Sequence, residues 1–173
     1  MPRNLGKALE RLLGPHKDGR MCTHQLYKNR GLAMIRKIDV PMVKNQVTGQ
    51  WTFAQRTWFD YDGCLKGGRY LGMEAKEIGS DQLPIGASGL KPHQLEALIN
   101  FHAMGAVTGV LWMPDRDRCY WLSGEFLKRF KDLFYEKPYK YIPLRTVEVT
   151  CPQVMTKDGF IDYLPSALTV VGP

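Results

Sequence analysis

The sequence lacks long apolar runs, a leader segment and internal repeats. No stretch of apolar residues approaches the length that a bilayer-crossing helix needs. The first residues, Met-Pro-Arg-Asn, lead into a mixed polar and apolar segment without the apolar core or cleavage site of a signal peptide. We therefore expect no membrane partner and a location in the cytoplasm in which the chain is made.

Cysteines are few and far apart. The four are Cys22, Cys64, Cys119 and Cys151; none forms a CxxC pair, and no histidine cluster stands beside them at zinc spacing. This pattern predicts free, mostly buried thiols and argues against a structural zinc site.

What the sequence does have is an excess of positive charge. Its 173 residues fit one domain, 1–173, and 44% hydrophobic with 24% charged residues is ordinary for a folded protein. Twenty-four Lys and Arg against seventeen Asp and Glu leave a net charge of +7, with a pI near 9.3. Such an excess favours a polyanionic partner, most commonly nucleic acid.

Hydrophobic periodicity and Gly/Pro punctuation predict helices mixed with strands. The predicted helices cover 4–13, 21–30, 92–104 and 123–134, and the predicted strands cover 32–38, 56–61, 69–76, 106–112 and 118–122. Ser123 is placed to cap the last of these helices. The order predicts a mixed α/β domain whose central sheet is flanked by helices.

Segment 42–57 is polar, basic and rich in Gln, Thr and Arg, with a Thr-Gly turn at 48–49. It shows no clear apolar face for packing. We expect it to project from the core as a hairpin or a flexible arm.

Residues 69–76 carry the clearest chemical signal. Alternation along a strand places Leu71, Met73 and Ala75 on one face and Tyr70, Gly72, Glu74 and Lys76 on the other. A glutamate and a lysine two residues apart then project side by side. Gly72 would leave room before them for a bulky ligand.

The preceding predicted strand supplies Asp60 and Asp62 on one face, with Phe59 and Tyr61 opposite. If the two strands pair through the glycine-rich turn at 63–68, an aspartate and Glu74 converge beside Lys76. Two carboxylates favour Mg²⁺ or Mn²⁺. A lysine beside such a metal suits phosphodiester hydrolysis, because it can steady the nucleophile or the developing negative charge.

Simpler interpretations exist for each feature. A Glu-x-Lys pair is often a surface salt bridge of little energetic weight. Asp62 could help or replace Asp60, but next to Gly63 a turn is the favoured interpretation. His93 fits a surface position at a helix start better than a general base. Aromatic side chains are interpreted as core and not as a base-stacking surface, namely Trp112, Trp121, Phe126 and Phe130.

At this point the sequence resembles the RecU-type Holliday-junction resolvases of the PD-(D/E)xK nuclease superfamily. The resemblance rests on Asp-Tyr-Asp-Gly at 60–63, Lys-Gly-Gly-Arg-Tyr at 66–70 and Glu-Ala-Lys-Glu at 74–77. It extends over nearly the whole chain, through Asn4-Leu5-Gly6 with Leu9-Glu10, Lys37 and Pro41 before a short stalk, His93-Gln94, and Ile161-Asp162-Tyr163.

The resemblance implies a restriction-endonuclease-like core and specific residue roles. Asp60, Glu74 and the carbonyl of Ala75 would bind Mg²⁺, with Mn²⁺ as a substitute, and Lys76 would be the catalytic lysine. Glu10 would be an additional acidic residue and Gln94 a supporting polar group. DNA phosphates would contact basic residues at and around the stalk, namely Lys37, Lys44, Arg56, Lys66 and Arg69; a merely solvated basic surface is the alternative.

By the same resemblance the chain would act as a homodimer that cuts two symmetry-related strands of a four-way junction. It would do so in the cytoplasm of a bacterial cell, or of a bacterial host if the chain is phage-encoded. One rival is a nuclease of the same superfamily that acts on duplex ends or flaps. The other is a non-catalytic DNA-binding protein, against which the intact set of Asp60, Glu74 and Lys76 argues.

Overall fold

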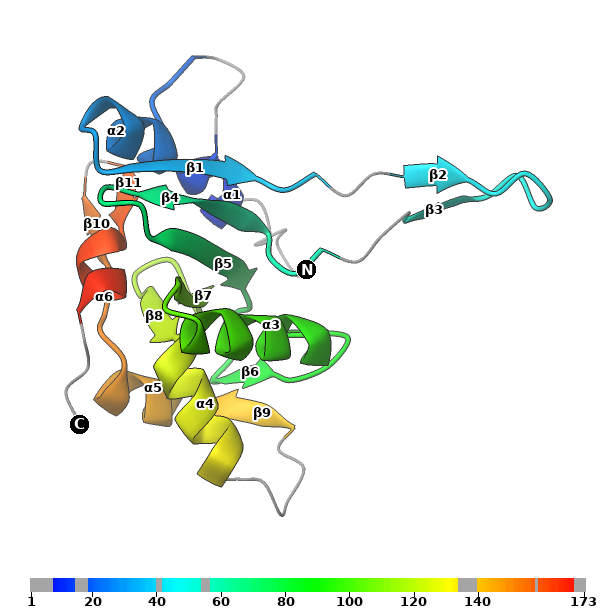
Figure 1. Ribbon diagram of the computed structural model, residues 1–173. Helices are drawn as coiled ribbons and strands as arrows, with labels where there is room; N and C mark the ends of the chain where they lie inside the picture. The colour runs from blue at the N-terminus through cyan, green and yellow to red at the C-terminus, as the bar shows by residue number, and fades with distance from the viewer. Residues whose placement is uncertain are drawn as a thin grey trace.

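A five-stranded mixed sheet forms the centre of the molecule (Figure 1). The computed structural model describes residues 8–14, 19–39, 42–53, 57–133, 140–157 and 159–169. The strand order is β1 (Ala33–Lys37), β4 (Tyr61–Leu65), β5 (Tyr70–Glu77), β7 (Val107–Met113) and β8 (Tyr120–Ser123). In this sheet β5 and β7 pair in parallel, whereas the β1–β4, β4–β5 and β7–β8 pairs are antiparallel. The predicted mixed α/β class is confirmed.

Helices cover both faces of this sheet. α3 (Pro92–Ala103) and α4 (Gly124–Leu133) bury one face in a core that includes Val110 and Trp112. On the other face, α1 (Ala8–Leu13) and α6 (Leu164–Leu168) share a second core with Leu71 and Met73, and α2 (Thr23–Asn29) packs beside β1. The two faces predicted for 69–76 thus point into two different cores, one on each side of the sheet.

Helix boundaries follow the local signals. The Ser123 hydroxyl accepts the backbone N–H of Phe126 at 3.1 Å, as expected of a helix cap. Gly105 follows α3 with φ +92°, a conformation that glycine adopts readily. The start predicted for 4–13 and the end predicted at Phe134 lie outside the described residues.

Several short elements have no counterpart among the sequence predictions. β6 (Gln82–Pro84) pairs with β9 (Tyr141–Pro143), β10 (Met155–Lys157) pairs with β11 (Phe160–Asp162), and α5 (Leu144–Thr150) follows β9. Three-residue strands are too short to show an alternating pattern, so periodicity cannot reveal them.

The expected hairpin in the arm is confirmed by β2 (Met42–Lys44) and β3 (Trp51–Phe53), which pair with each other and project from the body (Figure 1). Its turn includes Gly49 at φ +69°. The hairpin is less polar than the sequence interpretation had it, because it exposes four apolar side chains: Met42, Val43, Val47 and Trp51.

The strand predicted for 56–61 is wrong. β4 begins only at Tyr61, and Phe59 and Tyr61 lie in different cores instead of sharing a face. The ring of Phe59 covers Gly72, where an added Cβ would lie 2.6 Å from a ring carbon. The space at Gly72 therefore accommodates Phe59 and not a ligand.

All four cysteines are free, and all but Cys64 are buried, as expected. Trp112, Trp121 and Phe130 are buried and Phe126 is partly buried, so the core interpretation of these aromatics is confirmed. None of the helices in the described ranges is both long and apolar enough to cross a membrane.

Candidate active site

Glu74 lies in the middle of β5 and is completely buried. Its Oε2 accepts a hydrogen bond from Gln94 Nε2 at 2.7 Å and lies 2.9 Å from Lys76 Nζ. The side chain of Lys76 is only 15% exposed. The Glu-x-Lys pair thus lies largely buried in the middle of the sheet, and the surface salt-bridge interpretation does not hold.

Gln94 joins this pair to the first turn of α3. Its Oε1 accepts the backbone N–H of Lys91 at 3.1 Å and an N–H of Lys76 at 3.4 Å. Two donors on one oxygen fix the amide orientation, so the Nε2 group must face Glu74. Gln94 thus lies in hydrogen-bond contact with both Glu74 and Lys76.

Asp60 reaches the same strand from the other side. Its Oδ2 accepts the backbone N–H of Ala75 at 3.1 Å. In a ladder the N–H and C=O of one residue point toward the same neighbour, so the Ala75 carbonyl is also directed toward Asp60. The structure thus brings Asp60, Glu74 and Lys76 close together.

The surroundings of Glu74 disfavour its charged form. Burial and the charge of Asp60 raise the pKa of Glu74 to about 8, and the opposite charge of Lys76 only partly offsets this effect. Glu74 Oε1 is buried without a hydrogen-bond partner among the described residues. Such a pair fits a divalent cation, which would neutralise both charges and bind the remaining oxygen.

Protein side chains alone do not complete a metal shell here. Within the described ranges, no three His, Cys, Asp or Glu side chains gather closely enough to hold an ion. An ion held by two carboxylates and one backbone carbonyl would keep positions open for water and substrate. Open positions are typical of Mg²⁺ sites that bind phosphate.

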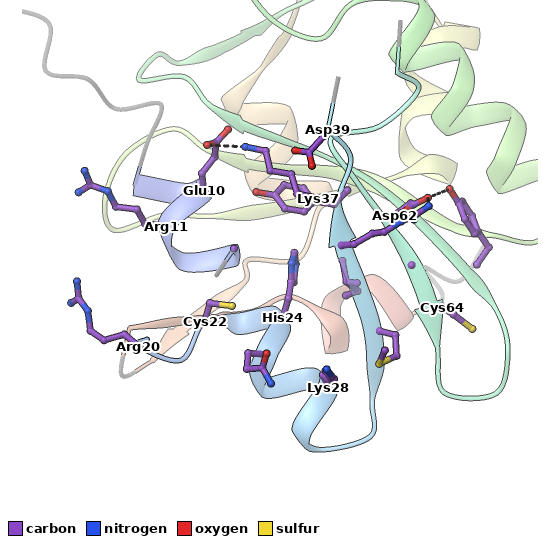
Figure 2. A pocket seen from close by; sticks show the side chains of 18 residues that line it. Glu10, Arg11, Arg20, Cys22, His24, Lys28, Lys37, Asp39, Asp62 and Cys64 are labelled. Carbon is purple, nitrogen blue, oxygen red and sulfur yellow. Dashed lines mark hydrogen bonds and ion pairs between the residues drawn. The ribbon is translucent and has the colours of Figure 1, made fainter. Parts of the chain in front are cut away.

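Glu10 lies on the opposite face of the sheet, in a cavity of about 1370 Å³ beside β1 (Figure 2). Its Oε2 is 3.1 Å from Lys37 Nζ. The pKa of Tyr61 is raised by burial and by the charges of Glu10 and Asp60, so both carboxylates lie near one buried hydroxyl. Glu10 thus lies near Asp60 on the far side of Tyr61. Among the described residues, the polar partners of Glu74 and Lys76 include Gln94 and each other, but not Glu10.

Glu77 is a residue that sequence reasoning did not single out for a role. Its Oε2 accepts the backbone N–H groups of Ala8 and Leu9, at 3.1 and 3.0 Å. These two hydrogen bonds connect the start of α1, the helix that carries Glu10, to the strand that carries Glu74. No local pattern could have shown it, because the partners are almost seventy residues apart.

Asp62 is not a turn residue, contrary to the favoured interpretation. It lies within β4 opposite Arg36, whose Nε binds its Oδ1 at 2.8 Å. The Tyr70 hydroxyl lies 3.3 Å from its Oδ2. Figure 2 shows Asp62 beside β1, with a dashed line marking its hydrogen bond. These partners hold Asp62 in its own ion pair, separate from Glu74.

The predicted DNA-binding residues are dispersed. Lys44 lies on the hairpin, and Arg56 lies outside the described residues. Lys66 and Arg69 occupy the β4–β5 turn, where Arg69 Nε binds the carbonyl of Gly105 at 3.3 Å. Since Lys66 is six residues beyond Asp60, this turn is about 20 Å along the sheet from the carboxylates.

Comparison with known proteins decides the family. The model of the RecU family, "Recombination protein U", matches residues 5–168. The chain belongs to the RecU family. RecU proteins are Holliday-junction resolvases, nucleases of DNA recombination, so the resemblance stated from the motifs is confirmed.

One solved structure similar to this RecU-family chain is Hjc, a Holliday junction resolvase from the archaeal hyperthermophile Archaeoglobus fulgidus. The match has 15% identity and a TM-score of 0.43, and covers 74% of this chain and 89% of Hjc. A search of curated protein sequences found no match.

Proposed function

We propose that this chain is a Mg²⁺-dependent endonuclease that resolves four-way DNA junctions as a homodimer in the cytoplasm. The observation that carries the proposal is the convergence of Asp60, Glu74 and Lys76 around the middle of β5. A half-buried aspartate beside a fully buried glutamate costs stability, and such perturbed carboxylates cluster at functional sites. Hydrolysis of a phosphodiester uses all three groups.

Asp60, Glu74 and the Ala75 carbonyl are the proposed ligands of Mg²⁺, for which Mn²⁺ can substitute. When bound there, the ion supplies Lewis acidity toward the phosphodiester. The orphaned Glu74 Oε1 and the raised pKa of Glu74 support this assignment. Glu10, on the far side of Tyr61, adds negative charge near Asp60 without entering the ligand set.

Lys76 is the proposed catalytic lysine. Its ammonium lies between Glu74 and Gln94, 2.9 and 3.4 Å from their oxygens. Two acceptors hold the side chain against the sheet, so that its remaining proton is free to donate to a phosphate oxygen as negative charge develops. Gln94 positions both the lysine and the glutamate.

Junction binding is assigned to positive charge on both sides of the site. Lys37 and Lys44 lie on β1 and the projecting hairpin, and Lys66 and Arg69 lie at the far turn. This spacing suits contact with more than one helical arm. A twofold dimer would present two such sites to a substrate that is itself symmetric.

The test is a cleavage assay on labelled four-way junction, linear duplex and flap DNA, with and without Mg²⁺. We expect junction cleavage that needs the metal and that is lost in Asp60→Asn, Glu74→Gln and Lys76→Ala. The matched control is Asp62→Asn, whose carboxylate is held by Arg36 and which should retain cleavage.

The outcomes separate the rivals. Equal cutting of flap or duplex by a monomer would favour the general nuclease. If the protein binds DNA but cleaves none of the three substrates, the non-catalytic DNA-binding protein is favoured. Cleavage that survives all three substitutions would place the active site elsewhere.

A further inference from the structure

We propose that Trp58 stacks on one nucleobase of the bound junction, two or three nucleotides from the cut. The inference rests on the proposed function, because it places the base relative to the Asp60–Glu74 site. It assigns a base-binding surface that the metal site, the hairpin and the basic residues do not account for.

The ring of Trp58 is 60% exposed, although tryptophan is highly buried on average. Contacts with other aromatic rings hold the exposed ring in place. One side packs on Phe101 of α3, with ring centroids 5.3 Å apart and planes inclined at 56°. Phe101 in turn meets the edge of the buried Phe59 at 5.1 Å. The indole is therefore held by the core while much of its surface faces solvent.

Trp58 borders a cavity of about 360 Å³ over α3, within the range of small-ligand sites. Its other lining residues are His93, Glu96, Ala97, Asn100 and Phe101. Aromatic walls beside polar edges suit a heterocyclic base, since rings stack on the face and an asparagine side chain can bind a base edge. Glu96 would repel a phosphate, but Lys131 lies 3.6 Å from its Oε1 and offsets that charge.

The position matches the course of a DNA strand. Trp58 is two residues before Asp60, a separation of at most about 7 Å. Phe101 is seven residues after Gln94 on α3, which is about 10 Å along the helix. One DNA strand advances about 3.4 Å per nucleotide. A phosphate at the carboxylates thus places a base two or three nucleotides away at Trp58.

A base inside a stacked duplex does not expose its face to an indole. The base at Trp58 must therefore be unstacked, as bases can be where arms of a junction meet. The same surface would contact linear duplex poorly. Trp58 is in this way a residue that determines specificity for the branch point.

The experiment measures junction binding in EDTA, where no cleavage occurs, with wild type, Trp58→Ala, Trp58→Phe and Trp58→Leu. The substrates are the intact junction and junctions with one abasic site at one to four nucleotides from the cut. The matched control is Tyr141→Ala, which removes another exposed ring, on β9. Leucine retains apolar contact with Phe101 but lacks an aromatic face.

We expect Trp58→Ala and Trp58→Leu to weaken intact-junction binding about tenfold, Trp58→Phe less, and Tyr141→Ala not at all. An abasic site two or three nucleotides from the cut should weaken wild-type binding similarly, and the two losses should not add. The proposal would be overturned if the losses of affinity from Trp58→Ala and from the abasic site added in free energy at every abasic position. It would also be overturned if wild-type binding were insensitive to all abasic sites. A Trp58→Ala protein that sediments as a monomer where wild type is a dimer would likewise overturn it, because the ring would then contact a second copy.

Binding and cleavage are scored separately. Non-additive binding by a protein that never cleaves would leave the base site standing while the nuclease proposal fails. Junction cleavage together with additive binding losses would leave the nuclease proposal standing while the base site fails.

Discussion

The side-chain amide of Gln94 donates a 2.7 Å hydrogen bond to the buried Oε2 of Glu74, and so joins helix α3 to the middle of the sheet. Gln94→Leu should remove this donor and weaken both Mg²⁺ affinity and cleavage, each by about 10- to 100-fold. Calorimetry and single-turnover cleavage measure the two effects. Gln82→Leu, at an exposed glutamine on β6, is the control. Unchanged metal affinity in Gln94→Leu would remove this positioning role.

Metal binding should displace a proton. With the pKa of Glu74 raised to about 8, the folded chain holds a proton there that the unfolded chain has lost above about pH 4.5. The contribution of Glu74 to stability is therefore full below that pH and is lost as the pH rises through about 8. Mg²⁺ added at about pH 7 should release most of one proton.

Calorimetry in buffers of different ionisation enthalpy counts this proton. The release should shrink above about pH 9 and should disappear in Glu74→Gln. Mg²⁺ binding with no buffer dependence at about pH 7 would contradict a protonated Glu74.

The salt dependence of junction binding tests the hairpin. Each phosphate contact contributes about 0.9 to the slope of log affinity against log salt. Lys44→Ala combined with Arg56→Ala should reduce that slope by about 2, measured by fluorescence anisotropy. Lys140→Ala, an exposed lysine at the start of β9, should leave it unchanged. An unaltered slope in the double variant would take these residues out of the interface.

Acid should destabilise the fold through His24. Burial lowers the pKa of His24 from 6.5 to about 4, and its Nε2 lies 3.0 Å from the Tyr163 hydroxyl. Between these pH values the unfolded chain binds the proton and the folded one does not, so stability falls as pH drops through the window. The full loss is about 3 kcal/mol. Urea unfolding of wild type and His24→Gln should show a flatter acid limb in the variant.

The sequence predicted β5, the strand that carries Glu74, better than it predicted the elements that surround this strand. Eight alternating residues suffice to place β5, and the face that carries Glu74 follows from the period of two. That Glu74 is fully buried could not be predicted, because α3 covers it from a distant segment. Asp60 converges as expected, since the β4–β5 turn is local.

The errors have one cause. The role of Asp62 depends on Arg36 lying opposite it in β1, and the path of residues 58–60 depends on Phe59 filling the space over Gly72. Both are long-range contacts, absent from any local pattern. The contact of Glu77 was not predicted for the same reason, because its partners are backbone N–H groups of the distant helix α1.

The hairpin of β2 and β3 pairs with itself and, within the described ranges, joins no strand of the central sheet. Glu74 and Lys76, by contrast, lie on a strand bonded on both sides. Insertions and deletions in the hairpin therefore cost the sheet no hydrogen bond, whereas any in β5 would shift every neighbouring register. Over evolutionary time the hairpin can therefore lengthen or shorten while the positions of Glu74 and Lys76 in the sheet stay fixed.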